Sequence, residues 1–301
     1  SYARYVQYMI ARYGAHITLL SPIHYDYYEQ TIPAEDYNVP INLAIERYGK
    51  PPFGTMLTAN PNPSTLVNFG PDSWIDLHQS GNVREHYTYW YLTEMFEAEH
   101  KPAINGEPYY AGLHQLAEPY PLRVPPDSED DRIYVRSGLY GSFLSGGLAG
   151  FIYGAEGIWQ SDVEPESLHK MWDSFGWESG NQVQHLKTFA TVEGQRYLEL
   201  TPCTEMVVPN KTGPGYAYKG WSYCAATPDR SLVMLYFEAD APMEARLRGV
   251  KPGDRFQPRF FDPRNGNWHE PGEAISVPRN GVLPLPPRPD AMDWGLMLQR
   301  L

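Results

Sequence analysis

KPAINGEPYYAG, residues 101–112, carries a lone carboxylate at the end of a short apolar segment. Residues 102–107 have the length and apolar character of a buried strand, with Glu107 as the last residue. In folds built from parallel strands, the active site lies at the carboxyl ends of the strands. The position of Glu107 therefore indicates a catalytic or binding acid. The alternative from the same pattern is a loop acid that caps a helix or pairs with an arginine.

The rest of residues 1–195 repeats this alternation of strands and helices. The pattern predicts strands at 16–21, 55–59, 74–78, 102–107 and 150–153, and helices at 2–13, 41–48, 84–99, 131–144 and 181–192. Strands joined by helical crossovers form a parallel sheet, in a barrel or in an open sheet. Five units are fewer than the eight of a (β/α)8 TIM-type barrel. We therefore expect another chain, or about 100–150 preceding residues, to complete it.

Residues 196–301 contain short β segments separated by turn signals instead. The Asn-Gly pairs in PRNGNW, residues 263–268, and PRNGV, residues 278–282, favour β-hairpins. This pattern predicts a small antiparallel β-sandwich after a domain boundary at 195–196. The fold class is thus α/β plus all-β. For the two cysteines, Cys203 and Cys224, a cross-strand disulfide and two buried free thiols both remain open.

The composition excludes several classes of partner. The formal net charge is −12, from 24 basic and 36 acidic residues, and it disfavours binding to nucleic acid and to anionic membranes. No apolar run approaches the ~18 residues of a membrane span. The 23 Tyr, 8 Trp and 11 Phe residues are typical of carbohydrate-active proteins, although a protein with long ordered loops has the same composition.

A second carboxylate follows the first predicted strand. The segment ITLLSPIHYDYYEQ, residues 17–30, places His24, Asp26 and Glu29 after that strand, with Asp26 among tyrosines. Cleavage of a glycosidic bond requires two carboxyl groups, one to protonate the leaving oxygen and one to attack or to activate water. The sequence therefore predicts Glu107 and Asp26 as the catalytic pair, drawn from a chain with 36 acidic residues.

Further candidates for substrate binding stand at the ends of the other predicted strands. They are His24, His78, Gln79, Tyr109, Tyr153, Glu156 and Trp159. We expect His78, Tyr109 and Trp159 to line the same pocket as Glu107. Tyr and Trp rings can stack on sugars while polar groups bind the hydroxyls, and rings that close the core are the alternative interpretation.

The sequence predicts no metal and no cofactor. It contains neither His-Glu-x-x-His nor a Cys/His cluster, so His78 is interpreted as a substrate ligand or a structural histidine. The Gly-rich SGGLAG, residues 145–150, lacks the Lys-Ser/Thr of a phosphate loop and the spacing of a dinucleotide fingerprint. Gly-x-Ser-x-Gly is absent and neither cysteine has an obvious catalytic partner, which argues against serine and cysteine hydrolases.

Four segments together resemble a known family. NGEPYY (105–110), VRSGLYGSFLSGGLAGFIYGAEGIW (135–159), FDPRNGNW (261–268) and DWGLMLQ (293–299) are similar to the apiosidase-like glycoside hydrolases of family 140. The resemblance covers nearly the whole chain with its order preserved. It implies a (β/α)8 barrel followed by a small β-sandwich, sometimes labelled a collagen-binding domain. It also implies a retaining mechanism with carboxylates after the fourth and seventh barrel strands.

By this resemblance Glu107 matches the nucleophile after the seventh strand. The family often has Gly-Gly-Asp after the fourth strand, where this chain has SPIHYD, residues 21–26. Asp26 is the candidate acid/base, whereas a direct alignment puts His24 at that position. Relatives often carry His where this chain has Glu156, which implies a different substrate.

The resemblance also implies the biological setting. The expected partner is an oligosaccharide or a plant or algal polysaccharide, from which a side-chain sugar such as apiose or another furanoside is removed. A polymeric substrate implies a secreted or periplasmic protein, although no signal peptide opens the sequence. The alternatives are a non-catalytic carbohydrate-binding or scaffold protein on a degenerate barrel, and an open-sheet α/β protein complete at five strands.

Overall fold

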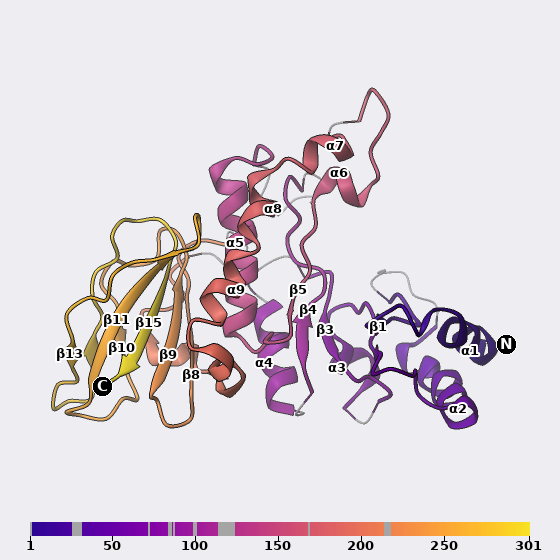
Figure 1. The fold of residues 1–301 in the computed structure, drawn as a ribbon, viewed down its shortest axis with the longest axis horizontal. Coiled ribbons are helices and arrows are strands. Elements are labelled where there is room, and N and C mark those ends of the chain that lie inside the picture. Colours follow the sequence, from indigo (N-terminus) through magenta and orange to yellow (C-terminus); the bar gives the residue numbers. More distant parts are fainter. Residues whose placement is uncertain are drawn as a thin grey trace.

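The computed structural model describes residues 2–25, 32–71, 73–83, 86, 88–98, 101–113, 124–167, 169–213 and 218–301. Figure 1 shows a parallel sheet and its helices in the middle of the molecule. The antiparallel strands lie at one end, and helices α1 and α2 lie at the other.

Parallel strands form the centre of the N-terminal part. β1 (Leu19–Leu20) pairs with β2 (Met56–Leu57), while β3 (His78–Ser80), β4 (Ala103–Asn105) and β5 (Gly150–Phe151) pair in chain order. The amides of Asp76 and Leu77 donate to the Leu57 carbonyl at 2.8 and 3.2 Å, so the chain entering β3 lies beside β2. The carboxyl ends of β3, β4 and β5 therefore meet at one edge of the sheet.

Helices connect these strands. They are α1 (Tyr2–Tyr13), η1 (Ala34–Tyr37), α2 (Asn38–Tyr48), α3 (Thr65–Phe69), α4 (Thr88–Ala98) and α5 (Glu129–Leu144). After β5 the chain forms α6 (Glu156–Trp159), α7 (Met171–Ser174), α8 (Glu178–Gln182), α9 (His185–Ala190) and the 3-10 turn η2 (Gly194–Glu199). Helices α1 and α2 pack their apolar residues Val6 and Ile41 on Leu20 and Leu57 of the first strand pair, which forms a separate small core.

Helix α5 is the most deeply buried of the described helices, with 13 of its 16 residues buried. Ser128 caps its N-terminus by accepting from the Asp131 amide, and three acidic residues follow in the first turn, where the helix dipole favours them. Its small residues allow close packing, because the backbone at Gly141 lies against the ring of Tyr89 from α4. This close approach explains the glycine at position 141.

Two antiparallel sheets form the C-terminal part. The larger sheet has the order β12 (Asn267–Trp268), β11 (Arg255–Asp262), β15 (Trp294–Arg300), β9 (Leu232–Phe237), β8 (Ser222–Ala226) and β6 (Thr201–Pro202), with β13 (Ile275–Ser276) also paired to β11. The smaller sheet joins β14 (Leu283–Pro284), β10 (Arg246–Leu247) and β7 (Val207–Val208), and the 3-10 turn η3 (Thr204–Met206) precedes β7.

The larger sheet is apolar on both faces, and β9 shows why. Val233, Leu235 and Phe237 pack between the two sheets, whereas Leu232, Met234 and Tyr236 belong to the core shared with α4 and α5. Tyr236 stacks on Tyr140 of α5 at 4.8 Å between ring centroids. One face of the larger sheet therefore packs in the core of the C-terminal part, and the other face packs on the N-terminal part.

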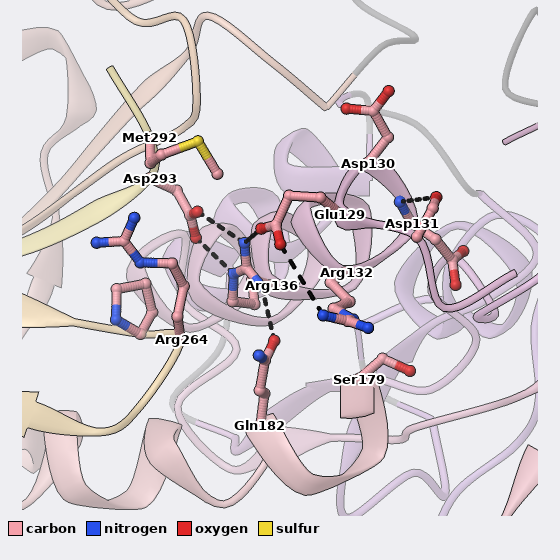
Figure 2. A network of polar contacts seen from close by, with 12 residues as sticks. Glu129, Asp130, Asp131, Arg132, Arg136, Ser179, Gln182, Arg264, Met292 and Asp293 are labelled. Carbon is pink, nitrogen blue, oxygen red and sulfur yellow. Dashed lines mark hydrogen bonds and ion pairs between the residues drawn. The ribbon is translucent and has the colours of Figure 1, made fainter. Parts of the chain in front are cut away.

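A buried ion pair fixes the contact between α5 and this sheet (Figure 2). Arg136 donates to both carboxylate oxygens of Asp293 at 2.8 and 2.9 Å, and also to Gln182 of α8 at 2.6 Å. Burial works against the charge on Arg136, but the adjacent Asp293 outweighs it and raises the pKa of this guanidinium. Tyr236 completes the network by donating to Asp293 at 2.9 Å.

The structure confirms helix 2–13 as predicted. Helices α2 and α5 begin three and two residues before the predicted helices 41–48 and 131–144, and α4 lies within the predicted helix 84–99. The third strand lies at His78–Ser80 instead of 74–78, because the amides of Asp76 and Leu77 bond to a single carbonyl of β2. The predicted helix 181–192 is divided into α8 and α9, and the short helices α3, α6 and α7 were not predicted. The boundary at 195–196 stays a prediction.

Three further findings concern the described residues alone. Every helix there is too short or too polar to span a bilayer. No group of three or more His, Cys, Asp or Glu side chains is placed there to hold a metal ion. Cys203 and Cys224 are free thiols that face each other with their sulfur atoms 3.5 Å apart.

The packing of α5 predicts opposite effects for two glycines one turn apart. A methyl group at Gly141 would come within 2.6 Å of the Tyr89 ring, whereas one at Gly138 would meet its nearest neighbour at 3.7 Å. Gly141→Ala should therefore destabilise the protein by about 1–3 kcal/mol. Gly138→Ala should be neutral or stabilising by up to about 1 kcal/mol, because alanine favours the helix. Urea unfolding measures both, and equal effects would contradict the packing described.

Candidate active site

Glu107 lies two residues beyond β4 and is only 4% exposed. Its amide donates to the Asn105 side-chain oxygen at 3.3 Å, and the amide group of Asn105 donates to Ser142 of α5 at 3.0 Å. The end of β4 is therefore tied to the most buried helix of the fold. This anchoring holds the backbone of Glu107 in a fixed position relative to the sheet.

Asn60 brings two more strand ends to Glu107. It follows β2, and its Nδ2 lies 3.1 Å from Glu107 Oε2 and 3.3 Å from His24 Nδ1. His24 follows β1 and forms a parallel bridge with Asn60. An amide nitrogen carries two hydrogens and can contact both neighbours at once. The ends of β1, β2 and β4 thus converge on one carboxylate.

Gln79 supports the residue before Glu107. It extends from β3 and donates to Thr58 Oγ1 at 2.8 Å, and its side-chain oxygen occupies the space where a side chain at position 106 would be. Only glycine fits at Gly106, since an added methyl group would come within 1.9 Å of that oxygen. Gln79 is nearly buried in this position. Gln79 therefore lies beside the residue that precedes Glu107, with its amide bonded to the protein, and its role in substrate binding stays a prediction.

His78 lies on the other face of the sheet. Its Nδ1 is 2.8 Å from Thr65 Oγ1 of α3, and its side chain is completely buried. Successive side chains of a strand point to opposite faces, so Gln79 and His78 cannot both face Glu107. The structure thus corrects the expectation that His78 lines the pocket, and the cause is the shift of the third strand by which His78 begins β3 instead of following it.

Tyr109 is buried between the two parts of the protein and is 1% exposed. Its hydroxyl donates to Asp131 of α5 at 2.6 Å, and its ring packs on Tyr134 and Tyr218. Burial, followed by the charge of Asp131, raises the pKa of Tyr109, which keeps the hydroxyl protonated as a donor. A side chain so enclosed cannot stack on a sugar, so the expectation that Tyr109 lines the pocket is corrected.

The residues after β5 form an outer layer on the same edge. Ala155 bridges Ala111, and the Glu156 amide donates to the Ala111 carbonyl at 2.9 Å. Trp159 is 51% exposed, and its ring centroid lies 6.0 Å from that of Tyr110 in an edge-on arrangement. This aromatic pair is accessible to a ligand, and Tyr110 is a residue that the sequence analysis did not select.

Two other predicted residues sit in that layer in different ways. Glu156 is fully buried at the start of α6, where Gln160 donates to its Oε1 at 2.8 Å. Tyr153 is half-buried, and its hydroxyl lies 3.1 Å from Ser179 of α8. Burial raises the pKa of Tyr153. Neither side chain has a contact with Glu107 among those described.

Asp26 lies outside the described residues, two positions beyond His24. His24 itself lies beside Asn60. Asn60 is the functional candidate that sequence reasoning missed. The signal was available, since Asn60 directly follows the predicted strand 55–59, at the same edge from which the other candidates were drawn.

The sequence model of one protein family, described as the apiosidase-like catalytic domain, matches residues 1–196. The chain belongs to this family. The prediction of a glycosidase is thereby confirmed at the level of enzyme class. A comparison of this chain with curated proteins found no match.

Solved structures share the fold of the apiosidase-like chain. A glycoside hydrolase matches with a TM-score of 0.73 at 16% identity, over 99% of this chain and 68% of the other. A glycoside hydrolase of family 5 from Bacteroides vulgatus matches with a TM-score of 0.73 at 15% identity, over 99% of this chain and 66% of the other. A further glycoside hydrolase from that organism matches with a TM-score of 0.64 at 12% identity, over 100% of this chain and 55% of the other. The chain thus spans about two thirds or less of the length of these proteins.

The contact between Gln79 and Gly106 predicts a strong coupling between two substitutions. Gly106→Ala alone should cost about 1–3 kcal/mol of stability, because the methyl group displaces the Gln79 amide from Thr58. In a Gln79→Ala background the space is empty, and the same change should cost less than about 1 kcal/mol. Urea unfolding of the parent chain, the two single variants and the double variant gives the coupling free energy. Additive costs would show that Gln79 does not occupy this position.

Proposed function

We propose that the chain is a retaining glycosidase in which Glu107 is the nucleophile and Asp26 the general acid/base. The observation that carries the proposal is the convergence of Glu107, Asn60 and His24 from three strand ends, in a chain of the apiosidase-like catalytic family. The carboxyl ends of parallel strands are where (β/α) enzymes hold their catalytic groups. We place β1 to β5 as consecutive strands of a (β/α)8 barrel, completed by a further segment or another chain.

The proposed reaction proceeds in two steps. The ionised Glu107 attacks the anomeric carbon and forms a glycosyl-enzyme, while the protonated Asp26 gives its proton to the leaving oxygen. Asp26 then takes a proton from the water that hydrolyses the intermediate. This route requires the two carboxyl groups to lie about 5–5.5 Å apart. The Asn60 amide holds one oxygen of Glu107, so the direction of attack is set before substrate binds.

The surrounding residues suit a sugar. His24 lies beside Asn60, and we place its imidazole within reach of a substrate hydroxyl. Trp159 and Tyr110 provide aromatic rings on which the apolar face of a sugar can stack. We propose as substrate a side-chain sugar of a plant or algal polysaccharide, such as apiose or another furanoside. The family description and the family 140 resemblance support this choice.

A polymeric substrate implies a place of action. We propose that the protein is secreted or periplasmic, because a polysaccharide cannot enter the cytoplasm. Cell fractionation checks this proposal, and detection in the cytosol alone would contradict it.

Substitution of Glu107 tests the nucleophile. Glu107→Gln should lower turnover of an activated aryl furanoside by about 10⁴-fold or more while substrate binding remains, because the shape is kept and the attacking charge is lost. In Glu107→Ala, added azide should restore turnover and give a glycosyl azide of inverted configuration. A matched control is Glu193→Gln, a partly buried acid that accepts from Gln299 of the C-terminal sheet and should leave turnover unchanged. Full activity of Glu107→Gln would reject this site, and intact binding with no turnover in the parent chain would favour a carbohydrate-binding protein.

Comparison of Asp26 and His24 tests the acid/base. Asp26→Asn should lower the rate by about 10²–10⁴-fold on a natural substrate with a poor leaving group and much less on an activated aryl glycoside, which departs without a proton. His24→Ala should affect both substrates by a similar factor, since it binds a hydroxyl in either case. If Asp26→Asn is harmless on the natural substrate and His24→Ala shows the leaving-group dependence, the acid/base is His24.

A further inference from the structure

A cavity of about 890 Å³ lies between α4 and the C-terminal part. Its walls are formed by Trp90, Glu94 and Glu97 of α4 and by Glu205, Lys211 and Trp221 of the other side, among others. The volume is within the ~300–1,000 Å³ of typical ligand sites. Neither Glu107 nor any residue described beside it lines this cavity, so it is distinct from the candidate active site.

One side of α4 is turned to the cavity. Trp90, Glu94 and Glu97 stand at positions i, i+4 and i+7, which lie on one helical face. The opposite face, with Leu92 and Met95, is buried in the protein. Figure 1 shows α4 between the β3–β4–β5 sheet and β8. Helix α4 therefore separates the cavity from the sheet that carries Glu107.

Trp90 is an exposed aromatic ring in a fixed orientation. It is 66% exposed, and its indole nitrogen donates to the Glu94 carboxylate one turn further along α4. Trp221, in contrast, is stacked on His86 at 4.0 Å and has the Lys211 ammonium 4.9 Å from its ring centre. Both faces of Trp221 are thus in contact with protein groups, and Trp90 is the ring that offers a face to a ligand.

The charges in the cavity select among ligands. Glu94, Glu97 and Glu205 bring three carboxylates to its walls against the one ammonium of Lys211. Carboxylates accept hydrogen bonds from hydroxyl groups but repel other carboxylates. An oriented indole face rimmed by hydrogen-bond acceptors suits a neutral sugar, and the charge balance disfavours a uronate chain.

We propose that this cavity is a second carbohydrate-binding site, which holds a neutral segment of the polysaccharide while another part of the polymer lies at Glu107. The choice of a polysaccharide as ligand rests on the proposed function. Trp90 supplies the stacking surface, and the glutamates bind hydroxyls. Because the cavity and Glu107 lie on different sides of α4, the site retains the polymer without contacting the sugar that reacts.

Binding is measured with the full chain in a Glu107→Gln background, so that the probes stay intact. The probes are soluble arabinan, galactan, xylan and, as the anionic case, polygalacturonate, each cast in a native gel for affinity electrophoresis. We expect at least one neutral polysaccharide to retard the protein. Trp90→Ala should weaken that binding by about tenfold or more, because an aromatic stacking surface is lost.

The matched control is Trp172→Ala, which removes another half-exposed tryptophan outside the cavity, on α7, and should leave the retardation unchanged.

In the triple variant Glu94→Gln, Glu97→Gln, Glu205→Gln, binding of the neutral polysaccharide should persist and binding of polygalacturonate should strengthen. In a chain with Glu107 intact, Trp90→Ala should keep its activity on a small aryl glycoside within about twofold and lose activity on the polymer alone. A melting curve shows that each variant is folded, and Trp90→Phe, which keeps a ring, should bind with intermediate affinity.

The results separate this site from the catalytic proposal. Loss of hydrolysis in Glu107→Gln with unchanged retardation supports both. Retardation that depends on Trp90 in a chain without any glycosidase activity would keep the binding site and reject the enzyme. The binding site is rejected if no neutral polysaccharide retards the folded chain, if Trp90→Ala binds as tightly as its parent, or if Trp172→Ala loses as much affinity.

Discussion

The ion pair between Arg136 and Asp293 is the interaction on which the arrangement of this protein depends. Breaking a pair of charges so deeply buried is costly, because the remaining charge would have no compensating partner. It therefore holds α5 on the larger antiparallel sheet. The opposite side of α5 binds the end of β4 through Ser142 and Asn105, and Asn105 accepts from the amide of Glu107. The candidate nucleophile is thus positioned by a chain of contacts that starts in the C-terminal sheet, about 190 positions further along the sequence.

Buried carboxylates occur at several places, and their surroundings distinguish structural from catalytic roles. Glu238 accepts from Tyr223, from the Trp221 amide and from His86, all inside the core. Asp131 accepts from Tyr109 and from two backbone amides. Burial raises the pKa of Asp131, although these donors oppose the shift. Glu107 differs because it lies at a strand end, where Asn60 and His24 arrive from neighbouring strands. Position in the fold, and not burial alone, makes Glu107 the candidate nucleophile.

The sequence predicted the strand–helix order, the antiparallel C-terminal part and the position of Glu107, because each has a local signal: hydrophobic period, Asn-Gly turns, and an acid at the end of a strand. The predictions from sequence failed where tertiary contacts decide the register of a strand or the direction of a side chain. The register of the third strand depends on the Leu57 carbonyl, so His78 was assigned to the wrong face. Tyr109 was selected because it lies close to Glu107 in the sequence. Its side chain instead bonds to Asp131, which lies 22 positions away. Asn60 was missed although it directly follows the predicted strand 55–59, because its importance comes from its contact with Glu107, 47 positions further on.

The two apolar faces of the larger sheet have a consequence for how this architecture can be divided. Met234 and Tyr236 lie in the core of α4 and α5, while Val233 and Leu235 lie in the core between the sheets. Cutting the chain near residue 200 would expose Leu139, Tyr140 and Phe143 of α5. The resulting hydrophobic patch would promote aggregation. The C-terminal sheets are therefore no exchangeable module. Recombination that replaced them, in nature or in the laboratory, would have to supply a substitute wall for α5, so the two halves can be inherited and engineered only as a unit.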